Sequence, residues 1–336
     1  MKRAVFKRGG PLVRTVVFLA LAAVLFCWFS GVFRGKLNAD LIRPYYDEPD
    51  NSLDVVFVGS SHIMCGIYPM ELYESRGYTS YVFASSAQVM PQTYYQTVAA
   101  LETQTPQLLV LDMGDLFFST KTGDKSFVHM QTDNIRYSAN KVRLIMDLIE
   151  PEERLPNLLS LIQYHDRWED VTEEDFAPIT GLTKGAKISA EATPFDPPEV
   201  PDTKRWTAPS ENADKYLRKT LELCRDRGVD VLLLYLPSIV SPEHYEVIFS
   251  ARHYAEEYGV DFLNLMDYTD ELALDYAADF RDAAHLNQAG ALKATELVGE
   301  YIDTHYQIDR THSAELTEKW DADLAAYREE YPKQLP

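Results

Sequence analysis

Cysteine is scarce in this sequence. Only three occur among 336 residues, and one of them, Cys27, lies inside a long apolar segment. Cys65 and Cys224 are too few for a disulfide framework, so we expect both to be free, buried thiols. The sequence also lacks CxxC and HExxH motifs, and no histidines and cysteines have the spacing of zinc ligands. We therefore expect neither a metal ion nor a cofactor.

Basic residues are also few. From residue 37 onward the chain has 25 Lys and Arg against 52 Asp and Glu, a formal charge of −27. Such a surface repels phosphate backbones, which argues against a nucleic-acid partner, and it disfavours close contact with an anionic membrane face. It suits an uncharged or locally cationic substrate.

One long uncharged run stands out against this background: residues 15–33, "TVVFLALAAVLFCWFSGVF". Its length is just enough to cross a hydrocarbon core. No A-x-A-like site follows, so we expect an uncleaved anchor, not a signal peptide. Five basic residues precede the run and two follow it, namely Lys2, Arg3, Lys7, Arg8 and Arg14, then Arg34 and Lys36. This asymmetry predicts a single-pass cell-membrane protein with a cytoplasmic N-terminus and an extracytoplasmic body.

The body alternates short apolar runs with amphipathic ones, which predicts a parallel sheet between helices. Five runs are expected to be strands: 54–58, 80–84, 107–113, 229–237 and 260–266. Helices are expected over 138–149, 153–164, 210–227, 242–258 and 287–303. The expected fold is therefore α/β, with a five-stranded parallel sheet in a three-layer arrangement preceded by one transmembrane helix.

Three regions are expected along the chain. Residues 1–36 form a cytoplasmic stub and the anchor, and 37–305 form the α/β domain. Its interval 114–208 breaks the strand–helix rhythm and contains the proline-rich "TPFDPPEVPDTKRW", so we interpret it as an insertion over the carboxyl edge of the sheet. Residues 306–336 form a polar tail in which four apolar side chains at helical spacing predict a docking helix: Leu316, Trp320, Leu324 and Tyr327.

The first expected strand ends in a polar cluster, "DVVFVGSSH" (54–62). Ligands of open α/β sheets bind beyond the carboxyl ends of the strands, which is where Ser60, Ser61 and His62 would lie. A serine nucleophile needs a histidine base and an acceptor that orients it. Two of the eight histidines have an aspartate three residues earlier: His285 in "DAAHLN" and His312 in "DRTH".

Position separates these two histidines. His285 and Asp282 precede the last expected helix of the domain, on the same side of the sheet as Ser61, whereas His312 falls in the tail. We therefore expect Ser61, His285 and Asp282 to converge at the carboxyl end of the sheet. The simpler alternative is that "GSSH" is a polar turn, with Gly59 supplying backbone freedom.

A strand ending in Gly-x-Ser and a DxxH before the last helix resemble the SGNH (GDSL-type) hydrolase superfamily. The resemblance covers about residues 54–303 and implies a flavodoxin-like fold, with Ser61 as nucleophile, His285 as base and Asp282 as its partner. It also implies an oxyanion hole from the Ser61 and Ala87 amides. Two features depart from the family. Ala87 in "VFASSAQ" (82–88) replaces a glycine, and "LDMGDL" (111–116) lacks the asparagine of the third block.

Similar departures occur in membrane-anchored members that act on envelope polymers, and the chain resembles those of alginate O-acetylation and teichoic-acid D-alanylation. This resemblance implies a hydrolase or O-acyltransferase that acts on an envelope polysaccharide or acylated glycan, with a membrane-bound acyl-transfer partner. The alternative is an inactive SGNH-like binding or assembly protein. The remaining cleft candidates are His62, His129, His165, Arg167 and Trp168, with Arg167 as a replacement oxyanion donor. Packing of these side chains at helix ends is the competing explanation.

Overall fold

The computed structural model describes residues 9–202 and 204–332, and within them the chain forms two compact units. Among the described residues, one unit, here called the sheet unit, comprises 36–149, 179–202 and 204–332; the other, the N-terminal helix unit, comprises 9–35 and 150–178. The cytoplasmic placement of the N-terminus depends on Lys2, Arg3, Lys7 and Arg8, which lie outside the described residues. The boundaries proposed at residues 36 and 305 stay predictions.

The centre of the sheet unit is a parallel sheet of five strands in the order β2-β1-β3-β4-β5. This confirms the predicted α/β class and strand number. The strands are β1 (Val55–Val58), β2 (Ser80–Val82), β3 (Leu108–Asp112), β4 (Asp230–Tyr235) and β5 (Asp261–Asn264). Every residue of β1 and β3 is fully buried, as expected for central parallel strands that are covered on both faces.

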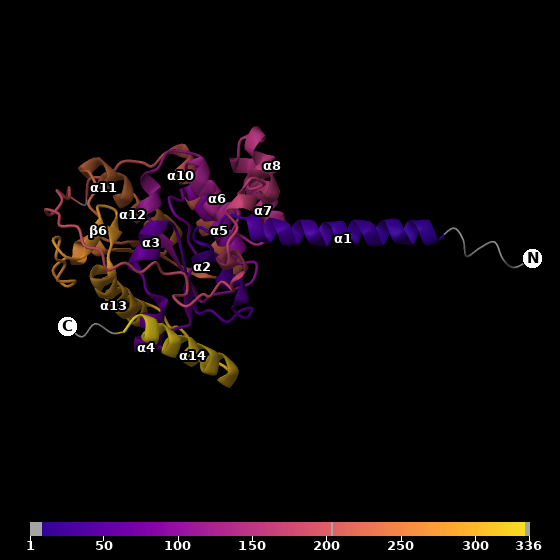
Figure 1. The fold of residues 1–336 in the computed structure, drawn as a ribbon. Helices are drawn as coiled ribbons and strands as arrows, with labels where there is room; N and C mark the ends of the chain where they lie inside the picture. Colours follow the sequence, from indigo (N-terminus) through magenta and orange to yellow (C-terminus); the bar gives the residue numbers. More distant parts are fainter. Residues whose placement is uncertain (1–8, 203, 333–336) are drawn as a thin grey trace, which may run out of the picture. The chain divides into compact units, whose positions relative to one another are not determined.

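Two groups of helices cover the sheet (Figure 1). In one group α13 (Gln288–His305) packs against α3 (Ser61–Gly66) and α4 (Pro69–Arg76). In the other, α5 (Met90–Ala100) packs against α10 (Glu211–Arg227) and α7 (Ala139–Leu148). From β1 the chain crosses to β2, whereas β3 leads toward β4 on the other side, so the strand order reverses between β1 and β3. Open α/β sheets bind ligands at such a switch point.

The structure confirms the helices predicted over 138–149, 210–227 and 287–303. Ser210 caps α10 by accepting from the Ala213 N–H, and Gly228 ends it in the left-handed conformation at φ 68°. The predicted helix 242–258 is instead two helices, α11 (Pro242–Phe249) and α12 (Ala251–Tyr258), which meet at Ser250. Two further short helices lie in this unit: α2 (Ala39–Ile42) and α6 (Lys125–Thr132).

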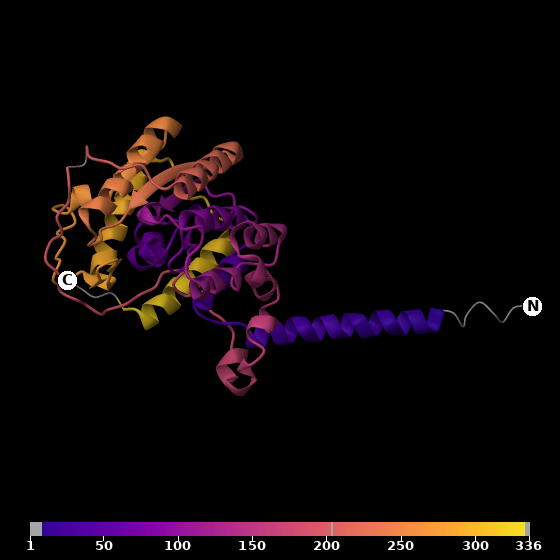
Figure 2. The ribbon, with the colours of Figure 1, turned by 90° about the horizontal axis from the view of Figure 1, so that it is seen from above.

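The prediction of one helix over 153–164 was wrong. This stretch holds α8 (Arg154–Leu158) and α9 (Ser160–Gln163), separated at Leu159, where the backbone is not helical (φ −125°, ψ 85°). Both belong to the N-terminal helix unit, together with α1 (Gly9–Phe33), which is one continuous helix in both views (Figure 1 and Figure 2). Residues 10–33 of α1 are long and apolar enough to cross a membrane, as a membrane anchor or a signal sequence would be.

The segment that follows residue 178 and includes the proline-rich stretch has no helix or strand among its described residues before Glu211, but it is hydrogen-bonded to the rest of the sheet unit. The Val82 N–H donates to the carbonyl of Lys184 at the edge of β2 (2.9 Å). Farther along, the Thr193 N–H donates to the carbonyl of Phe280 (2.8 Å). These bonds join the segment to Val82 at the end of β2 and to Phe280.

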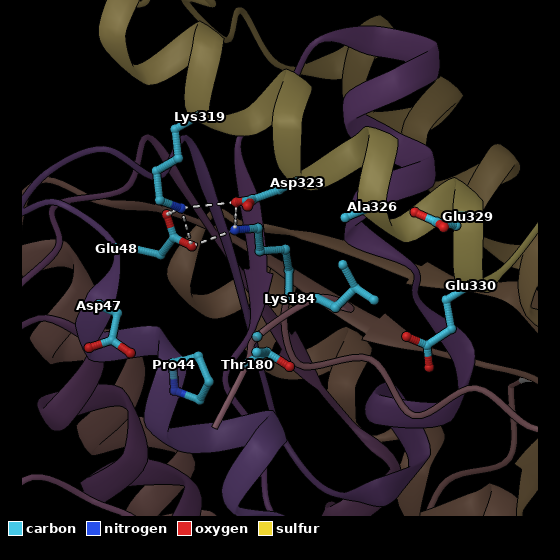
Figure 3. Close-up of a pocket in the computed structure, with 12 residues that line it drawn as sticks. Pro44, Asp47, Glu48, Thr180, Lys184, Lys319, Asp323, Ala326, Glu329 and Glu330 are labelled. Atoms are coloured by element: carbon cyan, nitrogen blue, oxygen red, sulfur yellow. Dashed lines mark hydrogen bonds and ion pairs between the residues drawn. The ribbon is translucent and has the colours of Figure 1, made fainter. Parts of the chain in front are cut away.

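The tail forms α14 (Ala314–Glu330), which lies beside α4 (Figure 1). Of the predicted stripe, Trp320 and Tyr327 are buried. At its base Lys184 bridges Glu48 and Asp323 at 2.6 Å each, and Lys319 also pairs with both carboxylates (Figure 3). Lys184 and Glu48 are nearly inaccessible to water, and in this cluster each has partners of opposite charge. Such pairing offsets the cost of burying the two charges.

The two thiols of the sheet unit are free and buried, as predicted. Burial raises the pKa of Cys65 and raises that of Cys224 to about 12. Neither thiol therefore has the thiolate character that a nucleophile requires.

Candidate active site

Ser61 follows β1 at the carboxyl edge of the sheet. Gly59 makes this turn, and a Cβ there would lie 2.3 Å from the Cβ of Asp112, so only glycine allows β1 and β3 to approach so closely. Ser60 then caps α3, accepting from the His62 N–H at 3.3 Å. Ser61 is the first residue of that helix, with its side chain free to face the cavity beyond the strand.

Asp282 and His285 lie on a small antiparallel hairpin that the sequence did not reveal. The hairpin is formed by β6 (Phe280–Asp282) and β7 (His285–Leu286), in which Asp282 pairs with His285 across the turn. Asn287 follows at once and caps α13 by accepting from the Ala289 and Gly290 N–H groups. The DxxH motif is thus held between a tight turn and a capped helix.

The three side chains meet as the sequence spacing predicts. Ser61 Oγ lies 2.8 Å from His285 Nε2, and His285 Nδ1 lies 2.6 Å from Asp282 Oδ1. The carboxylate accepts from Nδ1–H, so in the neutral ring Nε2 has the lone pair that accepts the hydroxyl proton of Ser61. The Ala284 N–H donates to the same Asp282 oxygen at 3.0 Å and fixes its orientation.

The environment keeps His285 a base and Asp282 an anion. Burial lowers the pKa of His285 below its ordinary value of 6.5, although the attraction of Asp282 opposes this effect. Burial alone would raise the pKa of Asp282, but His285, the Ala284 N–H and Arg281 together hold it below its ordinary value. At neutral pH the imidazole is therefore uncharged and the carboxylate ionised.

Arg281 binds the outer oxygen of the same carboxylate. Its Nε and Nη2 lie 3.1 and 3.0 Å from Asp282 Oδ2. Nη2 is also 3.2 Å from His285 Nδ1, but a guanidinium only donates, so this approach is no hydrogen bond while Nδ1 carries the proton given to Asp282. Arg281 thus orients Asp282 and adds to the lowering of the His285 pKa.

A cavity of about 320 Å³ opens beside Ser61 and His285. Its volume lies at the lower end of the range for small-molecule sites, roughly 300–1,000 Å³. The lining is mostly apolar or aromatic, with a few polar groups around Ser61. Its residues are Ser60, Ser61, His62, Ala87, Gly114, Phe117, Phe118, Tyr235, Ser238, Val240, His244, Ile248, Ala284 and His285.

Ala87 borders this cavity in an unusual conformation. Its φ is 49°, in the left-handed region that favours glycine. A residue that lacks a Cβ would adopt this turn without strain. Alanine at this position strains the turn more than glycine would, but it has the same backbone N–H group, which can still donate a hydrogen bond.

The sequence did not single out the residue at the end of β3, Asp112. It is fully buried, and its Oδ1 lies 2.9 Å from His62 Nδ1 and accepts from the Gly114 N–H at 2.9 Å. Its Oδ2 accepts from the Ser60 hydroxyl at 3.2 Å. The signal was present in "LDMGDL", where an aspartate ends an apolar strand beside the strand that leads to Ser61.

Asp115, three residues further on, is the second buried carboxyl of this cluster. Burial and the negative charge of Asp112 raise its pKa well above the ordinary value of 3.8. Its Oδ2 accepts from the Thr93 hydroxyl at 3.1 Å. Folding therefore favours the protonated form of Asp115 and the ionised form of Asp112.

Of the other cleft candidates, His129 belongs to the sheet unit but does not line the cavity, and the remaining three belong to the N-terminal helix unit. His129 is buried in α6, with Nδ1 3.5 Å from Asp133 Oδ2. His165 and Trp168 are exposed in the N-terminal helix unit. Arg167 of that unit donates to the carbonyls of Phe33 and Arg34, at 2.7 and 3.0 Å. Of the predicted cleft residues, the structure brings only His62 to the cavity.

No family model matches this sequence, and no curated protein matches it either. Among solved structures, one similar chain is from Bacteroides fragilis and is provisionally described as an acylhydrolase. It is 13% identical with a TM-score of 0.37, over 80% of this chain and 92% of the other. A GDSL-like lipase from Bacteroides thetaiotaomicron is 14% identical with a TM-score of 0.35, over 80% and 94%. At this level of similarity, the activity must be argued from the residues of this chain.

Proposed function

We propose that the protein is a serine-dependent acyl-ester hydrolase or O-acyltransferase of the SGNH type. The observation that carries the proposal is the contact of Ser61 Oγ with His285 Nε2 at 2.8 Å, with Asp282 at the other ring nitrogen. A hydroxyl, a neutral imidazole and an orienting carboxylate in this order are the components of nucleophilic acyl transfer.

In the first step Ser61 Oγ attacks the carbonyl carbon of an acyl ester while His285 takes its proton. The imidazolium then gives this proton to the departing alcohol, and the acyl group remains on Ser61. Water or a hydroxyl of an acceptor then attacks the acyl-serine, and His285 takes the proton of this attacking group. The bond between the acyl carbon and Ser61 Oγ breaks, and His285 gives the proton to Ser61 Oγ. The Ser61 and Ala87 amides serve as oxyanion donors, and the apolar cavity walls hold the acyl group.

We further propose that the substrate is an envelope polysaccharide or acylated glycan outside the cytoplasm. The apolar helix α1 supports a membrane anchor, and the excess of basic residues before residue 15 supports an N-terminus on the inside. The acidic body suits an uncharged glycan better than a polyanion. A membrane-bound partner would supply acyl groups if the protein is a transferase. Protease shaving of intact cells should release the sheet unit if this topology holds.

The full-length protein in detergent, assayed with p-nitrophenyl acetate, tests the chemistry. Ser61→Ala and His285→Ala should each reduce nitrophenolate release by about a thousandfold or more, because members of a triad act as a unit. Asp282→Asn should also cause a large loss, through the wrong imidazole tautomer. Ser75→Ala, on the exposed face of α4, is the matched control and should retain wild-type activity.

The second candidate is a binding or assembly protein that keeps this fold without efficient chemistry. The strained Ala87 and the absence of an asparagine from "LDMGDL" favour it. Wild-type protein that releases no more nitrophenolate than Ser61→Ala, and forms no acyl-enzyme, would support this second candidate and overturn the first.

A further inference from the structure

The cavity contains a second histidine with a carboxylate at its Nδ1. His62 is only 8% exposed, and its Nδ1 lies 2.9 Å from Asp112 Oδ1. Within the described part of the chain, the other ring nitrogen, Nε2, is buried and has no hydrogen-bond partner. A buried polar atom that is left unpaired costs free energy, and in a cavity wall it marks a place where a ligand can bind.

The partner of Nδ1 determines what Nε2 can bind. Burial alone would raise the pKa of Asp112, but the attraction and hydrogen bond of His62, with the N–H groups of Gly114 and Ser60, hold it below its ordinary value. An ionised carboxylate only accepts, so Nδ1 bears a proton, and in the tautomer with its proton at Nδ1 alone Nε2 has a lone pair and is an acceptor. His285 has the same arrangement, with its Nε2 already bonded to Ser61.

The ring of His62 is held in place on several sides. A Cβ on Gly114 would lie 2.8 Å from Nδ1, so the ring packs directly on the backbone. The ring of Tyr235 lies against it, with centroids 5.3 Å apart. Asp112 is itself fixed by Ser60 and Gly114. Nε2 is therefore an acceptor that is held in a fixed orientation.

We propose that His62 is a specificity residue for the acyl acceptor, and that its Nε2 accepts a hydrogen bond from one hydroxyl of a polyhydroxylated acceptor while a second hydroxyl attacks the acyl-serine. This inference rests on the proposed function and deepens it. A lone pair at Nε2 selects a hydroxyl donor, and because His62 and Ser61 line the same cavity, that hydroxyl would lie in the cavity that receives the acyl group. Water and monohydric alcohols have a single oxygen and cannot occupy both places.

In the transfer step the acyl group moves from Ser61 Oγ to the attacking hydroxyl. The attacking hydroxyl forms the new C–O bond and gives its proton to His285 Nε2. The bond between the acyl carbon and Ser61 Oγ breaks, and His285 returns the proton to Oγ. The hydroxyl bonded to His62 keeps its proton throughout and only orients the acceptor.

The experiment measures how the acyl group partitions between two acceptors. Full-length protein in detergent at pH 8 receives p-nitrophenyl acetate with equal concentrations of glycerol and 1-propanol, and chromatography quantifies the two acetate esters. The wild type should favour glycerol about five- to tenfold after correction for the uncatalysed reaction, the effect of one hydrogen bond. A ratio no greater than that of the uncatalysed reaction would overturn the proposal.

Two variants of His62 distinguish the contribution of Nδ1 from that of Nε2. In His62→Asn the amide nitrogen replaces Nδ1 beside Asp112 and nothing replaces Nε2, so the preference for glycerol should vanish. In His62→Gln the longer side chain can place its amide oxygen near the position of Nε2, so this variant should restore part of the preference for glycerol. It also keeps the test available if the asparagine variant does not fold. His305→Asn, on the exposed end of α13, should preserve the wild-type ratio.

The two proposals fail in different ways. If Ser61→Ala still releases nitrophenolate at the wild-type rate, the serine mechanism fails, and the His62 proposal with it. If Ser61→Ala is inactive but His62→Asn keeps the full preference for glycerol, the serine mechanism stands and the His62 proposal alone is wrong.

Discussion

Ser61 Oγ and His285 Nε2 lie 2.8 Å apart although 224 positions separate them in the chain. The first ends the turn after β1 and the second lies on a hairpin just before α13. Both open onto one cavity at the carboxyl edge of the sheet, where the strand order reverses. The predictions below follow from this contact and from its neighbours.

The pH dependence of kcat/KM should report the ionisation of His285, the proposed base. The pKa of His285 is lowered by burial, and the active form of the ring is neutral. We therefore expect kcat/KM to be constant at neutral pH and to fall as the pH decreases through a value below 6.5, where the imidazolium forms. An acid limb centred above 6.5 would contradict this assignment.

Arg281 should shift the pH at which kcat/KM decreases on the acid side, although it takes no part in the chemical steps. Its positive charge lowers the pKa of His285, so Arg281→Met should move the acid limb to higher pH. The same change removes two donors from Asp282, and kcat should fall at every pH. Arg225→Met, on the exposed end of α10, is the matched control. A loss of activity with no shift of the limb would indicate a merely structural role.

Ala87 should tolerate glycine and reject a branched residue. Its φ of 49° suits glycine, so Ala87→Gly should keep kcat/KM within about twofold of the wild type. Ala87→Val forces a β-branched side chain into a left-handed conformation, at a cost of about 1–3 kcal/mol, and shifts the amide that borders the cavity. Steady-state kinetics and thermal melting, with Ala325→Val as control, check both effects. Equal tolerance of both substitutions would count against the role of this turn.

Asp115 should lower stability at neutral pH. Burial and Asp112 raise its pKa above 3.8, so folding favours the protonated form, and its stability contribution is lost as the pH rises above the unfolded value. Asp115→Asn cannot ionise and should melt at a higher temperature than the wild type at pH 7. The difference should shrink as the pH falls toward 4. No such gain is expected for Asp196→Asn, on an exposed loop.

The sequence predicted the parts of this fold that depend on local pattern. The two-sided apolar character of 55–58 indicated a central strand, and Ser210 and Gly228 marked both ends of α10. The expected place of Ser61 followed from the end of the first strand, and that of Asp282 and His285 followed from their position before the last helix. The strand and the helix ends could be predicted because each depends on a few neighbouring residues, whereas the place of the site residues depended on the predicted order of strands and helices.

Other features depend on contacts between distant segments and could not be predicted. The cluster of Asp112, Asp115 and His62 exists only because β1 and β3 are neighbours in the sheet. The hairpin around Asp282 is too short for a visible alternation of apolar residues. Arg167 looked like a cleft residue by composition, yet it donates to carbonyls at the end of α1, a contact that no local pattern signals.

Covalent labelling of the nucleophile tests the central claim most directly. A fluorophosphonate reacts with serines that a histidine base activates, and peptide mass spectrometry locates the adduct. We predict one adduct on Ser61 in the wild type, none at this position in Ser61→Ala, and strongly slowed labelling in His285→Ala. Folded wild-type protein that stays unlabelled at Ser61, or carries its adduct on another serine, would contradict the assignment of Ser61 as the nucleophile.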